Sequence, residues 1–252
     1  KSDLIIAGSN FIFSHIKDNY SNYLKSNKKF LVIYRGINTD YFNAKKIKET
    51  DEILLKKKWN IKDNRKIILL PGRLTYWKGQ EMFIEALSKL KKNHSDKEFL
   101  AVILGSEQGR NVYKKQLIGL VEQYRLGKIV KFIKQTSDMP LVYRIANLVC
   151  SCSTEPEAFG RISVEAQSME LPIIASNIGG SKETIIDNKT GLLFKSGNAN
   201  DLAEKIITIM QKDYNSMKSM GFEGRKNVLK KFDVDKMCLT TFTEYKKLIE
   251  LS

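Results

Sequence analysis

Cysteine and histidine are scarce in this chain, which has three of the former and two of the latter in 252 residues. Neither His15 nor His94 lies in a motif, so we expect no Ser–His or Cys–His nucleophile and no Cys/His metal site. The odd cysteine count offers no disulfide framework, and Cys150, Cys152 and Cys238 are predicted to be buried free thiols in a reducing cytoplasm. The first two are predicted to point to opposite faces of one strand.

Long apolar runs are missing as well. No stretch of about 18 consecutive apolar residues occurs, so we expect no membrane-spanning helix. The first residues also lack the charged, apolar and small-residue succession of a signal peptide. We therefore expect a globular, cytoplasmic protein.

Acidic residues are outnumbered, with 28 Asp and Glu against 43 Lys and Arg and a formal net charge of +15. The excess is mostly lysine spread along the whole chain, a pattern that a compositionally biased genome also produces. No RNP-like, zinc-binding or arginine-rich segment is present, so nucleic acid is not an expected partner. The charge leaves open an acidic small substrate and a peripheral contact with an anionic membrane, such as the inner face of the plasma membrane.

Apolar strand-like runs and helix-like spacings alternate through most of the chain. The strands are expected at residues 3–9, 29–34, 66–70, 99–105, 129–133, 148–152, 172–176 and 191–194, and the helices at 11–20, 83–90, 113–124, 139–145, 198–210, 214–231 and 235–251, with another beginning at 161. From residue 65 onward, alternating elements of these lengths predict an α/β fold with a doubly wound parallel sheet. Residues 41–64 are polar and Lys-rich, and we interpret them as a connector with a short helix anchored by Ile53, Leu54 and Trp59.

The stretch from residue 153 to 194 carries polar residues that neither a strand nor a helix requires. Pro156 and Gly160 predict a loop after an apolar strand, and helical spacing begins at Arg161. The first N–H groups of that helix have no intrahelical partner, so they suit an anion or sugar hydroxyls. Glu157 on the loop and Glu165 inside the helix should face one cavity, in the crevice where open α/β sheets bind ligands.

A second candidate element follows the strand at residues 66–70. Gly72 would let a ligand approach the backbone, and Arg73 and Lys78 lie five residues apart on the next loop, so they can reach two phosphoryl groups. The alternative is a solvated loop in a chain rich in lysine. Residues 105–110, which follow another strand, are interpreted as a flexible rim.

These motifs together resemble those of the family 4 glycosyltransferases, which are retaining, nucleotide-sugar-dependent enzymes of the GT-B fold with two Rossmann-like domains. The resemblance is carried by Gly-Arg-x4-Lys-Gly at 72–79, Glu157 and Glu165 with Phe159-Gly160 between them, Leu-Pro-Ile-Ile-Ala-Ser-x-x-Gly-Gly at 171–180, and Thr190-Gly191-Leu192-Leu193. It implies that the chain is the C-terminal donor-binding half with the last piece of the N-terminal domain. The chain begins with Lys1 and not with Met, which we interpret as a piece of a longer protein.

The resemblance also predicts a division of the chain. Residues 1–38 would be the remnant of the N-terminal Rossmann-like domain, and 39–64 the linker. Residues 65–232 would form the nucleotide-sugar-binding domain, and 233–252 a helix that crosses back to the N-terminal domain.

The roles that the resemblance implies begin with the donor diphosphate, which Gly72, Arg73 and Lys78 would hold. Glu157 would contact hydroxyls of the donor sugar, and we group it with Arg73 and Lys78 as the catalytic set. Because two cations and a helix end can neutralise a departing diphosphate, neither a metal nor another cofactor is expected.

The remaining predicted site residues bind other parts of the donor. Glu165 would accept hydrogen bonds from the ribose hydroxyls. The segment after residues 130–133, with Lys134 and Gln135 at the strand end, would line the base through its backbone. The N–H groups of Phe159, Gly160 and Arg161 would bind the sugar. Arg161 replaces the apolar residue common at this place in the family, so it either adds a contact to a charged or bulky sugar or lies in the cleft wall.

The expected activity is transfer of a hexose or related sugar, with retention, from a UDP- or GDP-sugar to a cell-envelope acceptor such as lipopolysaccharide, capsule or glycolipid. A glycosidase would also use two acids, about 5 to 9.5 Å apart, but it has no need for Arg73 and Lys78. A sugar-phosphate or sucrose-type synthase would share the same donor site. An inactive binding module with a basic, membrane-facing surface is also compatible with the sequence.

Overall fold

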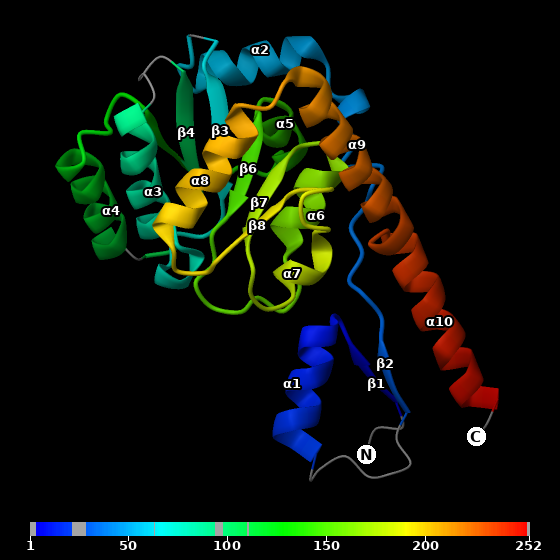
Figure 1. The fold of residues 1–252 in the computed structure, drawn as a ribbon. Coiled ribbons are helices and arrows are strands. Elements are labelled where there is room, and N and C mark those ends of the chain that lie inside the picture. The colour runs from blue at the N-terminus through cyan, green and yellow to red at the C-terminus, as the bar shows by residue number, and fades with distance from the viewer. Residues whose placement is uncertain (1–3, 22–28, 63, 94–97, 110, 251–252) are drawn as a thin grey trace.

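The structure is a computed structural model that describes residues 4–21, 29–62, 64–93, 98–109 and 111–250. Its larger part is a six-stranded parallel sheet in the order β5-β4-β3-β6-β7-β8, with helices on both faces (Figure 1). The predicted α/β fold with a doubly wound parallel sheet is thereby confirmed. The strands are β3 Lys66–Pro71, β4 Phe99–Leu104, β5 Val130–Ile133, β6 Leu148–Ser151, β7 Ile173–Ser176 and β8 Leu192–Phe194.

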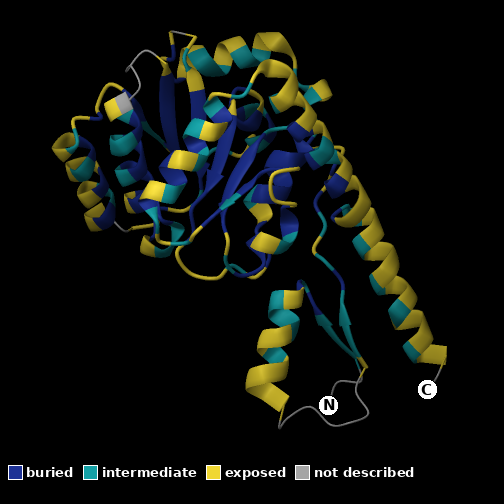
Figure 2. Ribbon diagram, viewed as in Figure 1, coloured by how far each residue is buried: buried dark blue, intermediate teal, exposed yellow. Residues whose placement is uncertain are grey.

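Two hydrophobic cores lie on the two faces of this sheet. Side chains alternate along β3, so that Ile68 and Leu70 pack into one core and Ile67 and Leu69 into the other. Because both faces are covered, the strands read as continuous apolar runs, as is typical of parallel sheets. The first core is closed by α3 Gln80–Asn93, α4 Asn111–Gln123 and α8 Ala199–Met210, and the second by α2 Glu49–Lys58, α5 Met139–Arg144, α6 Arg161–Ser168 and α9 Tyr214–Lys231 (Figures 1 and 2).

A smaller unit lies beside this domain and contains β1 Leu4–Ala7, α1 Asn10–Tyr20 and β2 Lys29–Val32, with β1 and β2 paired in parallel. The last helix, α10 Val234–Glu250, leaves the large domain and runs along the small unit (Figure 1), where Lys29 forms an ion pair with Glu244. Neither α1 nor α10 contains a buried residue. The helices of this βαβ unit and α10 therefore bury far fewer side chains than the helices of the six-stranded domain do.

Two chain segments cross between the domain and the small unit, and they pair with each other. Ile37 N donates to Phe232 O at 2.8 Å, and Val234 N donates to Ile37 O at 3.0 Å. A Cβ at Gly36 would lie 2.4 Å from the Val234 Cα, so only glycine allows the two segments to approach this closely. The paired crossing fixes where the chain enters and leaves the domain.

The connector differs from its prediction in one respect. It contains a short 3-10 helix, η2 Ala44–Lys46, and then α2, in which Ile53 and Leu54 are 59% and 61% exposed. The predicted anchors Ile53 and Leu54 are therefore wrong. The third predicted anchor, Trp59, is confirmed, because it is buried in the second core, against which Leu55 also packs.

The cysteine predictions need two corrections. Cys150 and Cys152 belong to the same core, because residues two apart in extended chain share a face. Burial raises the pKa of the Cys152 thiol well above its ordinary value. Cys238 is exposed and not buried. No described helix combines the length and apolar character that crossing a bilayer requires.

Candidate functional site

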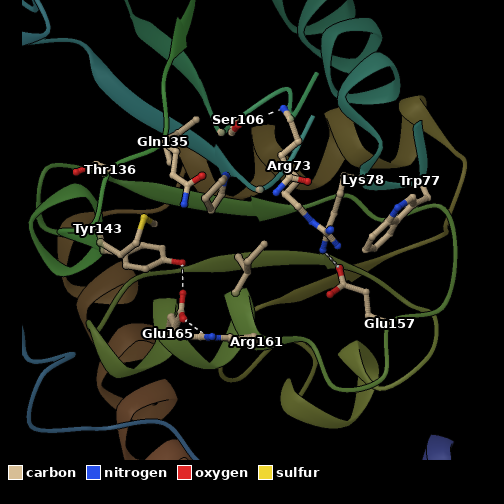
Figure 3. Close-up of a pocket in the computed structure, with 17 residues that line it drawn as sticks. Arg73, Trp77, Lys78, Ser106, Gln135, Thr136, Tyr143, Glu157, Arg161 and Glu165 are labelled. Carbon is tan, nitrogen blue, oxygen red and sulfur yellow. Dashed lines mark hydrogen bonds and ion pairs between the residues drawn. The ribbon is translucent and has the colours of Figure 1, made fainter. Parts of the chain in front are cut away.

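The candidate site lies at the carboxyl ends of the strands, where the order of the sheet reverses. β3 and β6 are neighbours there, with β4 and β5 beyond β3 and with β7 and β8 beyond β6. A cavity of about 500 Å³ opens at this point (Figure 3). It is lined by segments that follow β3, β4, β5 and β6. This is the topological switch point at which open α/β sheets bind ligands.

Glycines bring backbone close together in the wall of this cavity. Gly72 has a φ of 145°, and a Cβ at Gly105 would lie 1.8 Å from the Gly72 carbonyl oxygen. Side chains at these positions would therefore strain or separate the ends of β3 and β4. The two glycines therefore allow the ends of β3 and β4 to lie close together, and Gly72 places no side chain between the backbone of the β3 loop and a ligand.

The cations of that loop project into the same cavity. Arg73 is exposed, and Lys78 ends the short helix η3 Tyr76–Lys78. The Lys78 ammonium lies 4.4 Å and the Arg73 guanidinium 5.8 Å from the Trp77 ring centroid. Both distances fall within the cation–π range. Trp77, which sequence reasoning missed, thus lies beside both cations at the edge of the cavity (Figure 3).

Glu157 is held from two sides. Lys78 Nζ lies 2.7 Å from Glu157 Oε1, and the hydroxyl of Ser153 donates to the same oxygen. The side chains of Lys78 and Glu157 are both mostly buried, so this ion pair is less screened than a surface pair. This ion pair joins the loops after β3 and β6, which are far apart in the sequence. Apart from its position at a strand end, nothing in the sequence indicated that Ser153 would contact Glu157.

Glu165 is the most enclosed carboxylate of the cavity, with the residue 6% exposed. Tyr143 OH donates to its Oε2 at 2.8 Å, and Arg161 Nε lies 2.6 Å from its Oε1. Burial, and then the neighbouring Glu165 carboxylate, raises the pKa of Tyr143 well above its ordinary value. The phenol therefore remains a donor that orients Glu165. Tyr143 was predicted only as part of a helix, and nothing in its local sequence indicates this partner.

The loop that begins α6 is packed against the loop after β7. Gly160 has a φ of 92°, and a Cβ there would lie 2.7 Å from the Ser181 Cα. Gly180 N donates to Glu157 O at 2.7 Å. The two strand ends are therefore joined by backbone contacts. This joining sets the positions of Glu157 and of the first N–H groups of α6.

The structure brings most, but not all, of the predicted site residues to one place. The first cavity is lined by Gly72, Arg73, Lys78, Glu157, Arg161 and Glu165. Phe159 and Gly160 line a second cavity that adjoins it. Lys134 is exposed and does not line either cavity, whereas Gln135 and Thr136 line the first.

The segment after β4 was predicted to be a flexible rim, but it also lines the cavity and is bonded to a neighbouring loop. Gly105, Ser106 and Gln108 line the first cavity, and Ser106 O accepts a hydrogen bond of 3.0 Å from Leu74 N. This bond ties the segment to the loop after β3. Arg110 lies outside the described residues.

Within the described residues, His, Cys, Asp and Glu side chains form no group of three or more that could hold a metal ion. What the cavity offers is three cations, a pair of carboxylates and the amino end of a helix. These groups can bind a molecule that carries both phosphate and hydroxyl groups.

Comparison with known proteins agrees with this chemistry. The sequence profile described as "Glycosyl transferases group 1" matches residues 51–227, which is more than half of the chain.

The chain belongs to the glycosyl transferases group 1 family.

Among the relatives in this family is an uncharacterized glycosyltransferase of Methanocaldococcus jannaschii, which is 30% identical over 227 residues that make up 88% of this chain and 55% of the relative. The crystal structure of a glycosyltransferase from Rickettsia africae matches with a TM-score of 0.92 and 32% identity, over 99% of this chain and 64% of that one.

A structure of HepE from Anabaena in complex with UDP-glucose matches with a TM-score of 0.84 and 24% identity, over 98% of this chain and 64% of that one. The chain shares the α/β GT-B glycosyltransferase fold of these structural neighbours. The chain spans about half the length of two curated relatives that it matches, 47% and 55%.

Proposed function

We propose that this chain is the donor-binding part of a retaining, family 4-type glycosyltransferase that moves a hexose from a nucleoside-diphosphate sugar to a glycan or glycolipid acceptor of the cell envelope. The observation that carries the proposal is the meeting of Arg73 and Lys78 with Glu157 and Glu165 in one cavity. A UDP-glucose complex of a structural neighbour supports the choice of donor class.

The donor lies along the cavity in this proposal. The ribose hydroxyls donate to Glu165, which Tyr143 and Arg161 hold in place at 2.8 and 2.6 Å. The base extends toward Gln135 and Thr136. The diphosphate lies over Gly72, where no side chain blocks its approach to the backbone.

Binding of the diphosphate changes the partner of Lys78. Its ammonium, which lies 2.7 Å from Glu157 Oε1, turns to a phosphate oxygen. Glu157 is then free to accept hydrogen bonds from the donor sugar while Ser153 continues to hold it. The exchange links arrival of the diphosphate to preparation of the sugar site.

The bond between the sugar and the diphosphate breaks as the acceptor hydroxyl attacks from the same face. Negative charge grows on the departing diphosphate, and Arg73, Lys78 and the amino end of α6 stabilise it most in the transition state. These groups supply the positive charge that a metal ion provides in other transferases, so we propose a metal-independent reaction without a further cofactor. We also propose that it takes place in the cytoplasm, at or near the inner face of the membrane.

Calorimetry with UDP, GDP and ADP tests the proposal. Wild-type protein should bind at least one of the three, and Lys78→Ala should bind it about ten- to a hundredfold more weakly, because a charge-assisted hydrogen bond contributes about 1.5 to 3 kcal/mol. Lys226→Ala removes an exposed lysine of α9 that does not line either cavity, and it should bind like wild type. Equal affinities for wild type and Lys78→Ala would remove the diphosphate assignment.

A further inference from the structure

A third cavity, of about 670 Å³, lies at the amino ends of the strands, at the opposite end of the sheet from the donor cavity. Residues at the starts of β3, β6 and β7 line it, together with α2 on one side and the junction of α8 with α9 on another (Figure 1). None of the described residues that line it also lines either of the two cavities above. Because open α/β sheets bind their ligands at the carboxyl ends of the strands, neither the fold nor the donor motifs predict a site here.

The lining of this third cavity, as far as the structure describes it, is strongly basic. It contains two carboxylates, Glu52 and Glu170, and six cations, which are Lys56, Arg65, Lys66, Arg144, Lys212 and Lys218. This leaves four positive charges in excess, however the groups pair with one another. Like charges gathered in one cavity repel, so an anion that enters it lowers the electrostatic free energy.

Two of these cations are held in place by groups of the domain. Arg144 Nε lies 2.6 Å from Glu52 Oε1, and Lys66 Nζ donates to Met210 O, at the end of α8, at 2.9 Å. The contact at Nε leaves the two terminal nitrogens of Arg144 to act as a fork, and the Lys66 ammonium has further N–H groups to donate. Both cations are therefore positioned before a ligand arrives.

Two other lysines of the cavity have no counter-charge. Lys56 on α2 and Lys212 between α8 and α9 are half-buried, and no described carboxylate forms an ion pair with either, since those of the cavity contact arginines. Asp213, next to Lys212 in the sequence, instead accepts from Ser216 N at 2.9 Å and from Ser216 Oγ at 2.7 Å, and so caps α9. A charge that is partly removed from water is stabilised by a counter-ion. These two lysines indicate that an anion from outside completes the cavity.

We propose that this cavity is a second binding site, separate from the donor cavity, for a small soluble ligand that carries two or more phosphate groups. Each phosphate brings up to two negative charges and three acceptor oxygens, so a pair of them balances the excess within one cavity. The Arg144 fork binds one phosphate, and Lys56, Lys66 and Lys212 provide point charges for the other. The volume lies in the range of small-molecule sites, which favours a soluble ligand over a membrane surface. The inference does not depend on the function proposed for the donor cavity.

Calorimetry with tripolyphosphate tests this site at about 0.15 M salt, where surface charges more than about 8 Å apart are largely screened. Lys56→Ala/Lys212→Ala should bind tripolyphosphate about ten- to a hundredfold more weakly than wild type, because it removes charge-assisted hydrogen bonds. Lys56→Arg/Lys212→Arg should retain most of the affinity, since it keeps both charges. The alanine substitutions break no ion pair with a described residue, so the melting temperature without ligand should not change. Each single substitution provides the same test if the double variant does not fold.

Controls separate this site from the donor cavity and from the general positive charge of the protein. Lys78→Ala changes the donor cavity, and Lys115→Ala/Lys226→Ala removes two exposed lysines that line none of the three cavities. Both should bind tripolyphosphate within about twofold of wild type.

Four results would overturn the inference. The first is wild-type protein that does not bind tripolyphosphate, and the second is a control variant that loses as much affinity as Lys56→Ala/Lys212→Ala. The third is inorganic sulfate that binds as tightly as tripolyphosphate, which would reduce the cavity to a site for any single anion. The fourth is binding to phosphatidylglycerol vesicles without binding to tripolyphosphate, which would assign these cations to a membrane contact.

Discussion

The six-stranded domain and the small β1-α1-β2 unit are built from the same βα pattern but are stabilised in different ways. In the domain every residue of β4 is buried, and helices cover both faces of the sheet. In the small unit α1 has no buried residue, and β1 and β2 are mostly half-buried (Figure 2). The comparison shows that one sequence pattern can give either a buried core or a loosely covered unit, according to what packs on it.

Polar contacts join the two regions. Ser9 Oγ donates to Ala158 O at 2.5 Å, next to Glu157 in the site loop. The Glu183 carboxylate accepts from Asn10 N at 2.9 Å and from Phe11 N at 2.6 Å, at the positive end of α1. The small unit is thus attached to the loop that contains Glu157 and to the short helix α7 Ser181–Thr184, which follows β7.

The largest expected effect compares equivalent core substitutions in the two regions. Phe99→Ala in β4 removes a fully buried ring and should lower the free energy of unfolding by about 3 to 5 kcal/mol. Phe30→Ala in β2 removes a half-buried ring that stacks on Phe13 at 4.4 Å, and should cost about 1 kcal/mol. Urea denaturation of both variants measures the difference. Equal losses would mean that the small unit is as well packed as the domain.

The next effect concerns the contact between the regions. Glu183→Ala removes the acceptor for two backbone N–H groups of α1, and it should destabilise that helix by about 0.5 to 2 kcal/mol, as does loss of an N-cap. Hydrogen exchange at Asn10 and Phe11 should accelerate, while exchange in β4 should not change. Glu204→Ala, an exposed glutamate on α8, is the matched control. Unaltered exchange in α1 would show that the attachment does not depend on Glu183.

The smallest effect lies within the domain alone. Tyr143→Phe keeps the ring but removes the hydroxyl that donates to Glu165 at 2.8 Å. A hydrogen bond to a charged group contributes about 1.5 to 3 kcal/mol, but the hydroxyl acts on UDP only through the orientation of Glu165. UDP should therefore lose only part of this contribution and bind about two- to tenfold more weakly. Because Glu165 is proposed to read the ribose, 2′-deoxy-UDP should lose less affinity than UDP. The same loss for both nucleotides, measured by calorimetry, would argue against this role of Tyr143.

Much of the fold and part of the site could be predicted from local pattern. The apolar runs and the spacing of glycines indicated the strands from β3 to β8 and the loops that follow them. Gly72, Arg73 and Lys78 could be identified because a strand end, a glycine and two cations are close in sequence. Ile53 and Leu54 were assigned wrongly as anchors, because apolar character alone does not say which side of a short helix faces the domain.

Other features depend on contacts between residues far apart in the sequence. Tyr143 meets Glu165 across 22 residues, and Lys78 meets Glu157 across 79. Lys134 lies at a predicted strand end, yet its side chain is exposed outside the cavity while Gln135 and Thr136 line it. Which residue at a strand end faces the cavity is set by the packing of neighbouring loops, and no local pattern records it.

The sequence by itself determined the period of the strands and helices, the glycines that allow close approach of backbone, and the kinds of charge available at the strand ends. These are local properties, since they depend on backbone sterics and on side-chain chemistry. Only the tertiary structure decided that Lys78 pairs with Glu157, that Tyr143 orients Glu165, and that Lys56 and Lys212 line one cavity without a carboxylate partner among the described residues. Such pairings follow from how the sheet brings its strand ends together, because electrostatic and hydrogen-bond energies depend on distance in space and not on separation along the chain.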